Sequence, residues 1–285
     1  MLSDRYLIVR RQCRAKSPRL RVLALTAILA VWWLLSPALS RAGELDFPQT
    51  DYTLRSIDGS QVIGHVHFAA TTDRNGLTIL RGEYRYLNGE YDIDESTMRP
   101  GVAGKPPALV RTHHVFFFAN GSHDRESRVE IATGTGVCTI YTNGKPQVSS
   151  AKFNFPADTW AGDAVMLPLR RFVTEGGKGS TSFHAFNCVP GPKLLKVTVT
   201  ARAPAPWDYY PGNLTQVDVK PDFGWINVVI APFLPDIRAW FDAGDDTLFV
   251  GCETARYYKG LKYLMVHMRP DDAQMKAAPT RNSSQ

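Results

Sequence analysis

Short glycine-containing turns divide the early part of this chain into segments in which apolar and polar residues alternate. Asp58-Gly59, Asn75-Gly76 and Asn88-Gly89 each stand between two such segments. Asn-Gly and Asp-Gly pairs readily adopt the positive φ angles that tight hairpin turns require. Four β segments joined in this way form an antiparallel meander. The segments are residues 52–57, 61–71, 77–87 and 90–97.

The same alternation continues through most of the chain. It predicts a mainly β fold, a single curved antiparallel sheet or half-barrel with one or two short helices. The clearest helix is predicted over residues 163–174, with Asp163 as its N-cap and Pro168 delaying or kinking its regular part. The further predicted strands are residues 109–119, 128–132, 136–142, 148–155, 181–187, 193–201, 214–220, 225–230, 247–254 and 262–267.

Two prolines limit what one late segment can form. Pro232 and Pro235 directly flank the apolar pair Phe233-Leu234, so that stretch is not a central strand. Residues 236–241 are therefore expected to form a short helix-like turn or a rigid edge.

Alternation also separates two kinds of surface. In residues 61–71, Val66 and Phe68 face one side, and His65 and His67 face the other. One apolar face and one mixed face is the pattern of a sheet curled over a core or a cavity. The 14 Phe, 11 Tyr and 6 Trp residues either fill that core or line an apolar cleft.

Residues 1–42 have the order of an export signal. A basic segment, 1–21, precedes an apolar run, 22–35, and small residues follow. The sequence predicts a signal helix that is cleaved after Ser40 or Ala42, or that stays as a signal-anchor associated with the membrane. The chain is therefore expected in the periplasm or on the outer face of the cytoplasmic membrane.

Charge sets the leader apart from the remainder. Residues 1–21 contain seven of the 33 Lys and Arg residues and one of the 27 Asp and Glu residues. The rest of the chain therefore has 26 basic and 26 acidic residues. The net charge of +6 thus belongs to the leader, where it orients the N-terminus. A nearly neutral body is not expected to bind nucleic acid. Residues 43–270 are predicted to form one β-rich domain, and the polar residues 271–285 a disordered tail.

Histidines come in pairs at two places. His65 and His67 share one strand face, and His113 and His114 are adjacent in another strand. Two imidazoles two residues apart in a strand can bind one metal ion. No third ligand is fixed by the sequence, and paired surface histidines are common. The sequence therefore predicts no metal site and no cofactor.

Motifs for nucleophilic catalysis and phosphate binding are missing from the sequence. There is no Gly-x-Ser-x-Gly motif, and residues 177–180 lack the loop glycine of a P-loop. Carboxylates are the remaining candidates for chemistry. Asp92 and Asp94 share one strand face, and residues 242–246 contain three acids. Glycosidases use two carboxylates, while the alternative for both groups is a solvated turn.

Three cysteines follow the leader: Cys138, Cys188 and Cys252. In an oxidising compartment an odd number allows one disulfide and one buried thiol. The sequence leaves the pairing open. Because no Cys-x-x-Cys occurs, a thioredoxin-type activity is not expected.

Several short motifs follow the leader in the order Tyr52-Thr53-Leu54, Gly64-His65-Val66, Leu167-Pro168-Leu169-Arg170 and the segment 232–241. This order resembles the bacterial exported proteins of the domain of unknown function 3108. The resemblance implies a curved antiparallel sheet without an established activity, and some such sheets bind acyl chains on their concave face. The loop 99–107 and the Pro-rich residues 203–207 depart from the family pattern.

Two functions follow from these observations. The favoured one is a noncatalytic exported protein that binds an apolar or lipid-like ligand or serves envelope assembly. The alternative is an extracytoplasmic hydrolase that acts on cell-envelope carbohydrate through acids such as Asp92, Asp94 or Asp242. The sequence assigns no catalytic, cofactor-binding or metal-binding residue and no oligomeric state.

Overall fold

The structure, a computed structural model, describes residues 49–102, 105–188, 191–222, 237–242, 244, 248–257 and 260–268. The predicted signal segment 1–42, the predicted tail 271–285 and the predicted strand 225–230 lie outside these residues. No helix within the described ranges is long and apolar enough to span a membrane.

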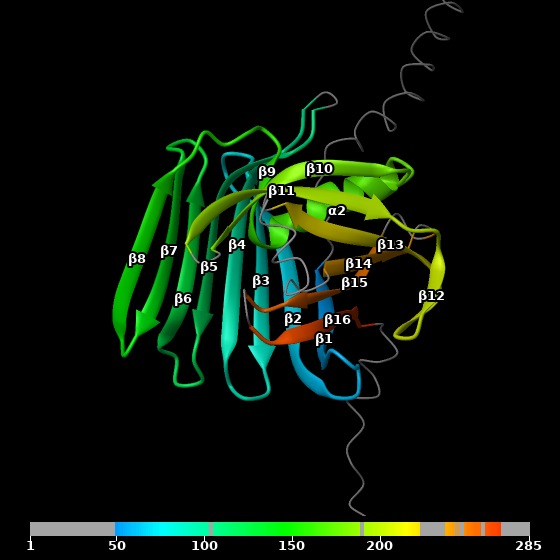
Figure 1. Cartoon of the computed structure of the whole chain (residues 1–285), viewed down its shortest axis with the longest axis horizontal. Helices are drawn as coiled ribbons and strands as arrows, with labels where there is room; N and C mark the ends of the chain where they lie inside the picture. Colours follow the sequence, from blue (N-terminus) through cyan, green and yellow to red (C-terminus); the bar gives the residue numbers. More distant parts are fainter. Residues whose placement is uncertain are drawn as a thin grey trace, which may run out of the picture. The chain divides into compact units, whose positions relative to one another are not determined.

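Most of the described chain forms one sheet (Figure 1), so the predicted mainly β fold is confirmed. The strand order is β8-β7-β6-β5-β4-β3-β2-β1-β16-β15-β14-β13-β11-β10-β9, and β12 pairs with β13 off this path. Adjacent strands are antiparallel except that β9 is parallel to β10.

The strand bounds follow the predicted segments closely over most of the chain. They are β1 (Thr50–Ser56), β2 (Val62–Thr72), β3 (Thr78–Tyr86), β4 (Tyr91–Arg99), β5 (Ala108–Phe117), β6 (His123–Glu130), β7 (Thr135–Thr142), β8 (Lys145–Lys152), β9 (Thr159–Trp160), β10 (Ser180–Cys188), β11 (Pro192–Ala201), β12 (Ala205–Trp207), β13 (Tyr210–Asp222), β14 (Ile237–Asp242), β15 (Leu248–Ala255) and β16 (Lys262–His267).

Glycines in left-handed backbone conformations connect the first four strands. Gly59, Gly76 and Gly89 have φ angles of 71°, 74° and 87°, which L-residues with a Cβ atom rarely adopt. They link β1 to β2, β2 to β3 and β3 to β4, all of which are antiparallel pairs. The predicted meander is therefore confirmed.

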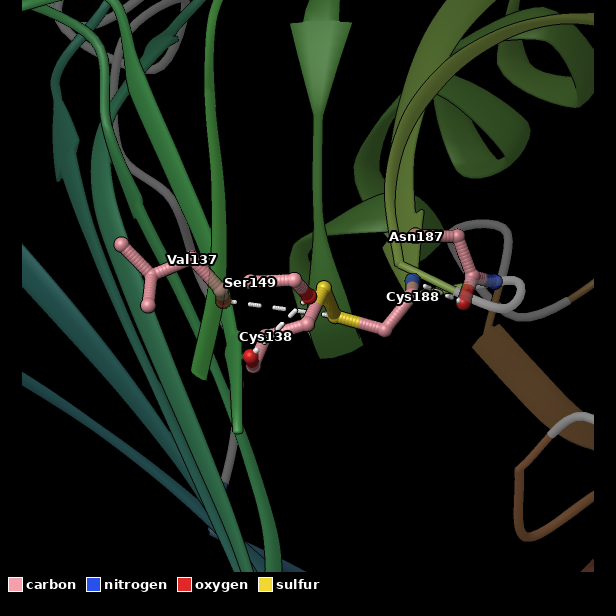
Figure 2. The surroundings of a disulfide bond; sticks show 5 residues. All are labelled: Val137, Cys138, Ser149, Asn187 and Cys188. Carbon is pink, nitrogen blue, oxygen red and sulfur yellow. Dashed lines mark hydrogen bonds between the residues drawn. A yellow bond between two sulfur atoms is a disulfide. The ribbon is translucent and has the colours of Figure 1, made fainter. Parts of the chain in front are cut away.

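The two ends of the sheet approach each other across a shared core. Strand β11 contacts β7 and β8, β10 contacts β6, and β9 contacts β5. Figure 2 shows the covalent link between these ends, a disulfide from Cys138 of β7 to Cys188 of β10, while Cys252 stays a free thiol. Buried residues such as Leu54, Phe68 and Val199 pack inside this curl.

A short helical segment packs into the curl. It consists of the 3-10 turn η1 (Gly162–Val165) and the helix α2 (Met166–Thr174), so Pro168 lies in the first turn, where proline is tolerated. Leu169, Phe172 and Val173 of α2 are buried in the core. The prediction of Asp163 as an N-cap is wrong: its carboxylate makes no capping bond and accepts a hydrogen bond from Tyr84 instead.

Residues 236–241 were expected to form a helix-like turn or a rigid edge, and that prediction is also wrong. Strand β14 covers most of them and is paired on both sides, with β13 and with β15. Ala239, Trp240 and Phe241 are buried there. The prolines precede the strand, so they remove no hydrogen bond from it. The sequence also missed the short strands β9 and β12, and it placed the start of β6 too late.

The disulfide should contribute measurably to stability because it joins residues 50 positions apart. Replacing Cys138 and Cys188 by Ser should lower the free energy of unfolding by about 4 kcal/mol, the loop-closure entropy of a ring of this size. Urea unfolding of the oxidised proteins measures the difference. Reductant should bring the wild type to the level of the variant and leave the variant unchanged. Equal unfolding free energies for the two oxidised proteins would contradict the role assigned to the bond.

Candidate functional site

Strand β4 turns an acidic face toward the interior. Asp92, Asp94 and Ser96 alternate along the strand and are 2%, 0% and 0% exposed. The predicted shared face of Asp92 and Asp94 is therefore confirmed, and the alternative of a solvated turn is wrong for this pair. A carboxylate taken out of water needs hydrogen bonds or a counter-ion. The two aspartates obtain them in different ways.

Asp92 is fully engaged by one arginine and one tyrosine. Arg256 Nε donates to both carboxylate oxygens at 3.0 Å, and Tyr86 Oη donates to Oδ2 at 3.0 Å. Arg256 also pairs through Nη1 with Glu90, and its guanidinium lies 4.4 Å from the centre of the Tyr86 ring. Burial raises the pKa of Asp92, and Arg256 opposes that shift only in part. These contacts describe a satisfied ion pair.

Asp94 forms a second ion pair, with a histidine of the neighbouring strand. His114 Nδ1 lies 3.1 Å from Asp94 Oδ2, while Ser96 Oγ donates to Oδ1 at 3.1 Å. Burial alone would lower the pKa of His114, but the Asp94 carboxylate outweighs it, so this pKa is raised. The His114 ring stacks on Phe116 at a centroid distance of 4.1 Å. The Asp94 carboxylate therefore holds His114 in place and favours its protonated form.

Asp163 approaches this pair from η1. Its backbone N–H donates to Asp94 Oδ1 at 3.3 Å, and its Oδ1 accepts a hydrogen bond from Tyr84 Oη at 2.6 Å. Burial and, next in size, the charge of Asp94 raise the pKa of Asp163 to about 8. At neutral pH the Asp163 carboxyl therefore holds a proton. We call Asp94, His114 and Asp163 the carboxylate–histidine cluster.

Parts of the carboxylate–histidine cluster lack hydrogen-bond partners. Within the described part of the chain, Asp163 Oδ2, Asp94 Oδ2 and His114 Nε2 are shielded from solvent and make no hydrogen bond. Asp94 Oδ2 has the His114 charge nearby, whereas Asp163 Oδ2 has none of the contacts that satisfy Asp92. Buried polar atoms without partners reduce stability, so each one calls for an explanation.

Two glycines make room for the carboxyl groups. A Cβ atom on Gly162, which has a φ of +54°, would lie 2.1 Å from Asp94 Oδ2. A Cβ atom on Gly82, the cross-strand partner of Asp94, would lie 2.2 Å from Asp163 Oδ2. Any other residue at either position would displace a carboxyl group. The backbone around the carboxylate–histidine cluster is thus fitted to the two acids.

A cavity of about 190 Å³ adjoins the carboxylate–histidine cluster. Its polar side includes Tyr84, Asp92, His114, Asp163 and Arg256. Its apolar side comes from the helical segment and the last three strands, and includes Val165, Met166, Leu169, Ala239, Phe249 and Met265. The site therefore combines buried acids with an apolar wall, in a space the size of one small molecule.

The other residues singled out from the sequence lie elsewhere. Asp242 ends β14, where its Oδ1 accepts from the Gly244 N–H at 2.9 Å, and it does not line the cavity. Acids 245 and 246 lie outside the described residues. His67 pairs with Asp51 at 2.7 Å, and His113 contacts Glu126 at 3.0 Å. In the described ranges no three His, Cys, Asp or Glu residues are grouped to hold a metal ion.

Three important residues of the site were not identified from the sequence as functional. Tyr84 was not singled out, and Asp163 was predicted only as a helix cap. Arg256 follows β15 without any motif around it. An informative signal was the pair Asp92 and Asp94 itself: if that face is buried, a cation and hydrogen-bond donors must come from distant segments.

Comparison with known proteins identifies no family for this chain. Its sequence matches no family model and no curated protein. Among solved structures, it is similar to the crystal structure of a beta-barrel-like protein of domain of unknown function DUF1849 from Brucella abortus. The sequences are 13% identical, the match covers 78% of this chain and 95% of that chain, and the TM-score is 0.43. The site described above is therefore interpreted from its own geometry.

Substituting Gly162 should show how tightly the carboxylate–histidine cluster is packed. Gly162→Ala places a methyl group against the Asp94 carboxylate, in addition to straining a positive φ. We expect a loss of roughly 1–3 kcal/mol from the overlap beyond about 1–2 kcal/mol for the backbone. Gly121→Ala is the matched control, because Gly121 has a φ of +79° and nothing within 4 Å of a new Cβ. Similar losses in urea unfolding for both variants would refute the packing argument.

The raised pKa of Asp163 predicts a pH dependence of stability. Between the ordinary aspartate pKa near 4 and about 8, the folded protein binds a proton that the unfolded chain lacks. This contribution is complete below that window and is lost as the pH rises through 8. Its slope is at most about 1.4 kcal/mol per pH unit, and the raised pKa of His114 acts in the same direction.

The variant Asp163→Asn isolates that contribution because an amide does not ionise. Unfolding in urea from about pH 5 to about pH 9 should show the wild type losing stability relative to Asp163→Asn as the pH rises. Asp208→Asn, at an exposed acid, should stay parallel to the wild type. Parallel curves for wild type and Asp163→Asn would show that Asp163 titrates normally in the folded state.

Proposed function

We propose that this chain is an exported, noncatalytic protein that binds a small amphipathic molecule in the cavity beside the carboxylate–histidine cluster. The cavity carries the proposal. Asp163 and His114 line it with hydrogen-bonding capacity that no described residue uses. Met166, Leu169 and Phe249 form an apolar wall. A ligand with a polar end and an apolar body satisfies both sides.

The size of the cavity limits the ligand. A cavity of roughly 150 Å³ in a protein core holds a benzene molecule, so about 190 Å³ accommodates one substituted ring or a short branched chain. A full acyl chain needs more space. Of the apolar and lipid-like ligands expected from the sequence, the volume favours the small ones.

Export is part of the proposal. The basic and apolar order of residues 1–42 supports it, and so does the Cys138–Cys188 disulfide, because such bonds persist in oxidising compartments. The same two observations support a location in the periplasm or on the outer face of the cytoplasmic membrane. Membership in the family of the domain of unknown function 3108 is proposed from the order of the sequence motifs, and a role in envelope assembly from the nearly neutral body and its aromatic content.

A hydrolase is the second candidate because two buried acids, Asp94 and Asp163, lie side by side. Burial and the Asp94 charge raise the pKa of Asp163, and acid–base pairs in enzymes are built from groups whose pKa values differ in this way. Asp92 is less suited to that role, since Arg256 and Tyr86 occupy both of its oxygens. The small volume argues against a polysaccharide chain as the substrate.

Native mass spectrometry of protein exported to the periplasm tests the binding function. We expect a small organic mass that dissociates on denaturation. In Ala239→Leu the added side chain fills part of the cavity, so that mass should be lost, whereas Val148→Leu, at an exposed position of β8, should retain it. The denatured mass also shows whether the leader has been removed.

Two results would contradict this function. One is a clean mass for the wild type combined with no thermal stabilisation by small aromatic probes. The other is release of reducing ends from peptidoglycan fragments by the wild type but not by Asp163→Asn, which would favour the hydrolase.

A further inference from the structure

The charges around the cavity do not balance when all three aspartates are ionised. Arg256 offsets Asp92, and His114 offsets Asp94. Asp163 then has no cation of its own among the described residues that line the cavity. Glu90 adds a further negative charge at Arg256 but is partly exposed. The interior therefore carries one carboxyl group in excess, and a proton neutralises it.

The remaining groups around the cavity do not correct this imbalance. Burial raises the pKa values of Tyr84 (β3), Tyr263 (β16) and Cys252 (β15), so all three are neutral at ordinary pH. The cavity-lining residues of α2 and β14 are apolar: Met166, Leu169, Ile237 and Ala239. No titratable group that lines the cavity from the described elements supplies a spare positive charge.

An anionic ligand does not fit this site. Arg256 is the obvious cation, yet Nε and Nη2 already donate to Asp92 and Nη1 pairs with Glu90. The charge of His114 is paired with Asp94 through Nδ1, so only its Nε2 is left to contact a ligand. An added carboxylate or phosphate would lie close to the carboxylates of Asp92 and Asp94 in a low-dielectric interior, where like charges repel strongly.

We propose that the ligand is a small organic cation, a primary ammonium on an apolar body about the size of one ring, and that it enters in exchange for one proton of the carboxylate–histidine cluster. This inference rests on the proposed function and names the class of its ligand. The Asp163 carboxyl turns Oδ2 from Gly82 toward the cavity and accepts a hydrogen bond from the ammonium. One proton leaves the cluster for solvent, and no covalent bond forms with the ligand.

The exchange has a quantitative signature. Because one proton is released for each cation bound, the binding constant should rise up to tenfold per pH unit until about pH 8 and then level off. A neutral molecule of the same shape has no such dependence. An anion of the same shape should not bind.

Isothermal titration calorimetry with three matched probes tests the inference. Benzylamine, benzyl alcohol and benzoate have one ring each and differ in charge at the polar end. Titrations near pH 6, 7 and 8, each in two buffers of different ionisation enthalpy, count the protons released. We expect benzylamine to bind at least tenfold more tightly than benzyl alcohol at pH 8 and to release close to one proton at pH 7.

Variants assign the effect to the carboxylate–histidine cluster. Asp163→Asn should lose both the preference for benzylamine over benzyl alcohol and the proton release. Asp208→Asn, at an exposed acid, should behave like the wild type. Should Asp163→Asn fail to fold, the proton count on the wild type still decides the matter.

The outcomes separate this inference from the proposed function. If benzyl alcohol binds as well as benzylamine and no proton is released, the ligand is not a cation, although the cavity still binds small molecules. If benzoate binds best, the charge argument is wrong. If none of the three probes binds and native mass spectrometry shows a clean mass, both the inference and the binding function fall.

Discussion

The acidic inward face of β4 is the constraint on which the rest of this structure depends. An ion buried without a partner destabilises a protein by several kcal/mol, so Asp92 and Asp94 require groups from other segments. Arg256 comes from the end of β15, 164 residues away, and the Asp163 N–H comes from η1, 69 residues away. These contacts tie the late strands and the helical segment to the early meander. The curl of the sheet is thus fixed by polar pairing as well as by the apolar core.

The two acids of β4 nevertheless differ in what surrounds them. All hydrogen-bonding groups of the Asp92–Arg256 pair are used, which suits a structural role. The carboxylate–histidine cluster is incompletely satisfied and carries a proton in place of a counter-ion. Buried ionic groups of this kind can often be replaced by apolar residues without loss of stability. A cluster that leaves buried polar atoms unpaired and borders a cavity is better explained by a ligand than by folding alone.

The sequence predicted what depends on neighbouring residues and missed what depends on distant ones. The turns at Gly59, Gly76 and Gly89 are local, because a positive φ is a property of the turn itself. The position of strand β14 depends on distant residues. The prolines before it suggested an edge strand, but it pairs with both β13 and β15. Propensity is a weak guide wherever partners far along the chain supply the hydrogen bonds.

The candidate site shows the same division more sharply. The two-residue period of a strand places Asp92 and Asp94 on one face. Because both faces of β4 carry polar residues, the sequence does not indicate which face points inward. Asp163 stands at the start of an apolar helical pattern, so the sequence predicted that it caps the helix. Its actual role depends on Gly82 and Tyr84, which belong to a strand about 80 residues earlier. Only the folded chain brings these groups together.

The cavity belongs to neither end of the chain alone. Its polar side comes largely from β3, β4, β5 and η1, and its apolar side from α2, β14, β15 and β16. The long-range ion pair between Asp92 of β4 and Arg256, which follows β15, joins these two sides. Because the site exists only in the folded state, anything that binds there stabilises the fold by mass action. A bound cation would also neutralise the excess carboxyl group at the pH where its proton is lost. Binding and stability are therefore linked through the same side chain, Asp163.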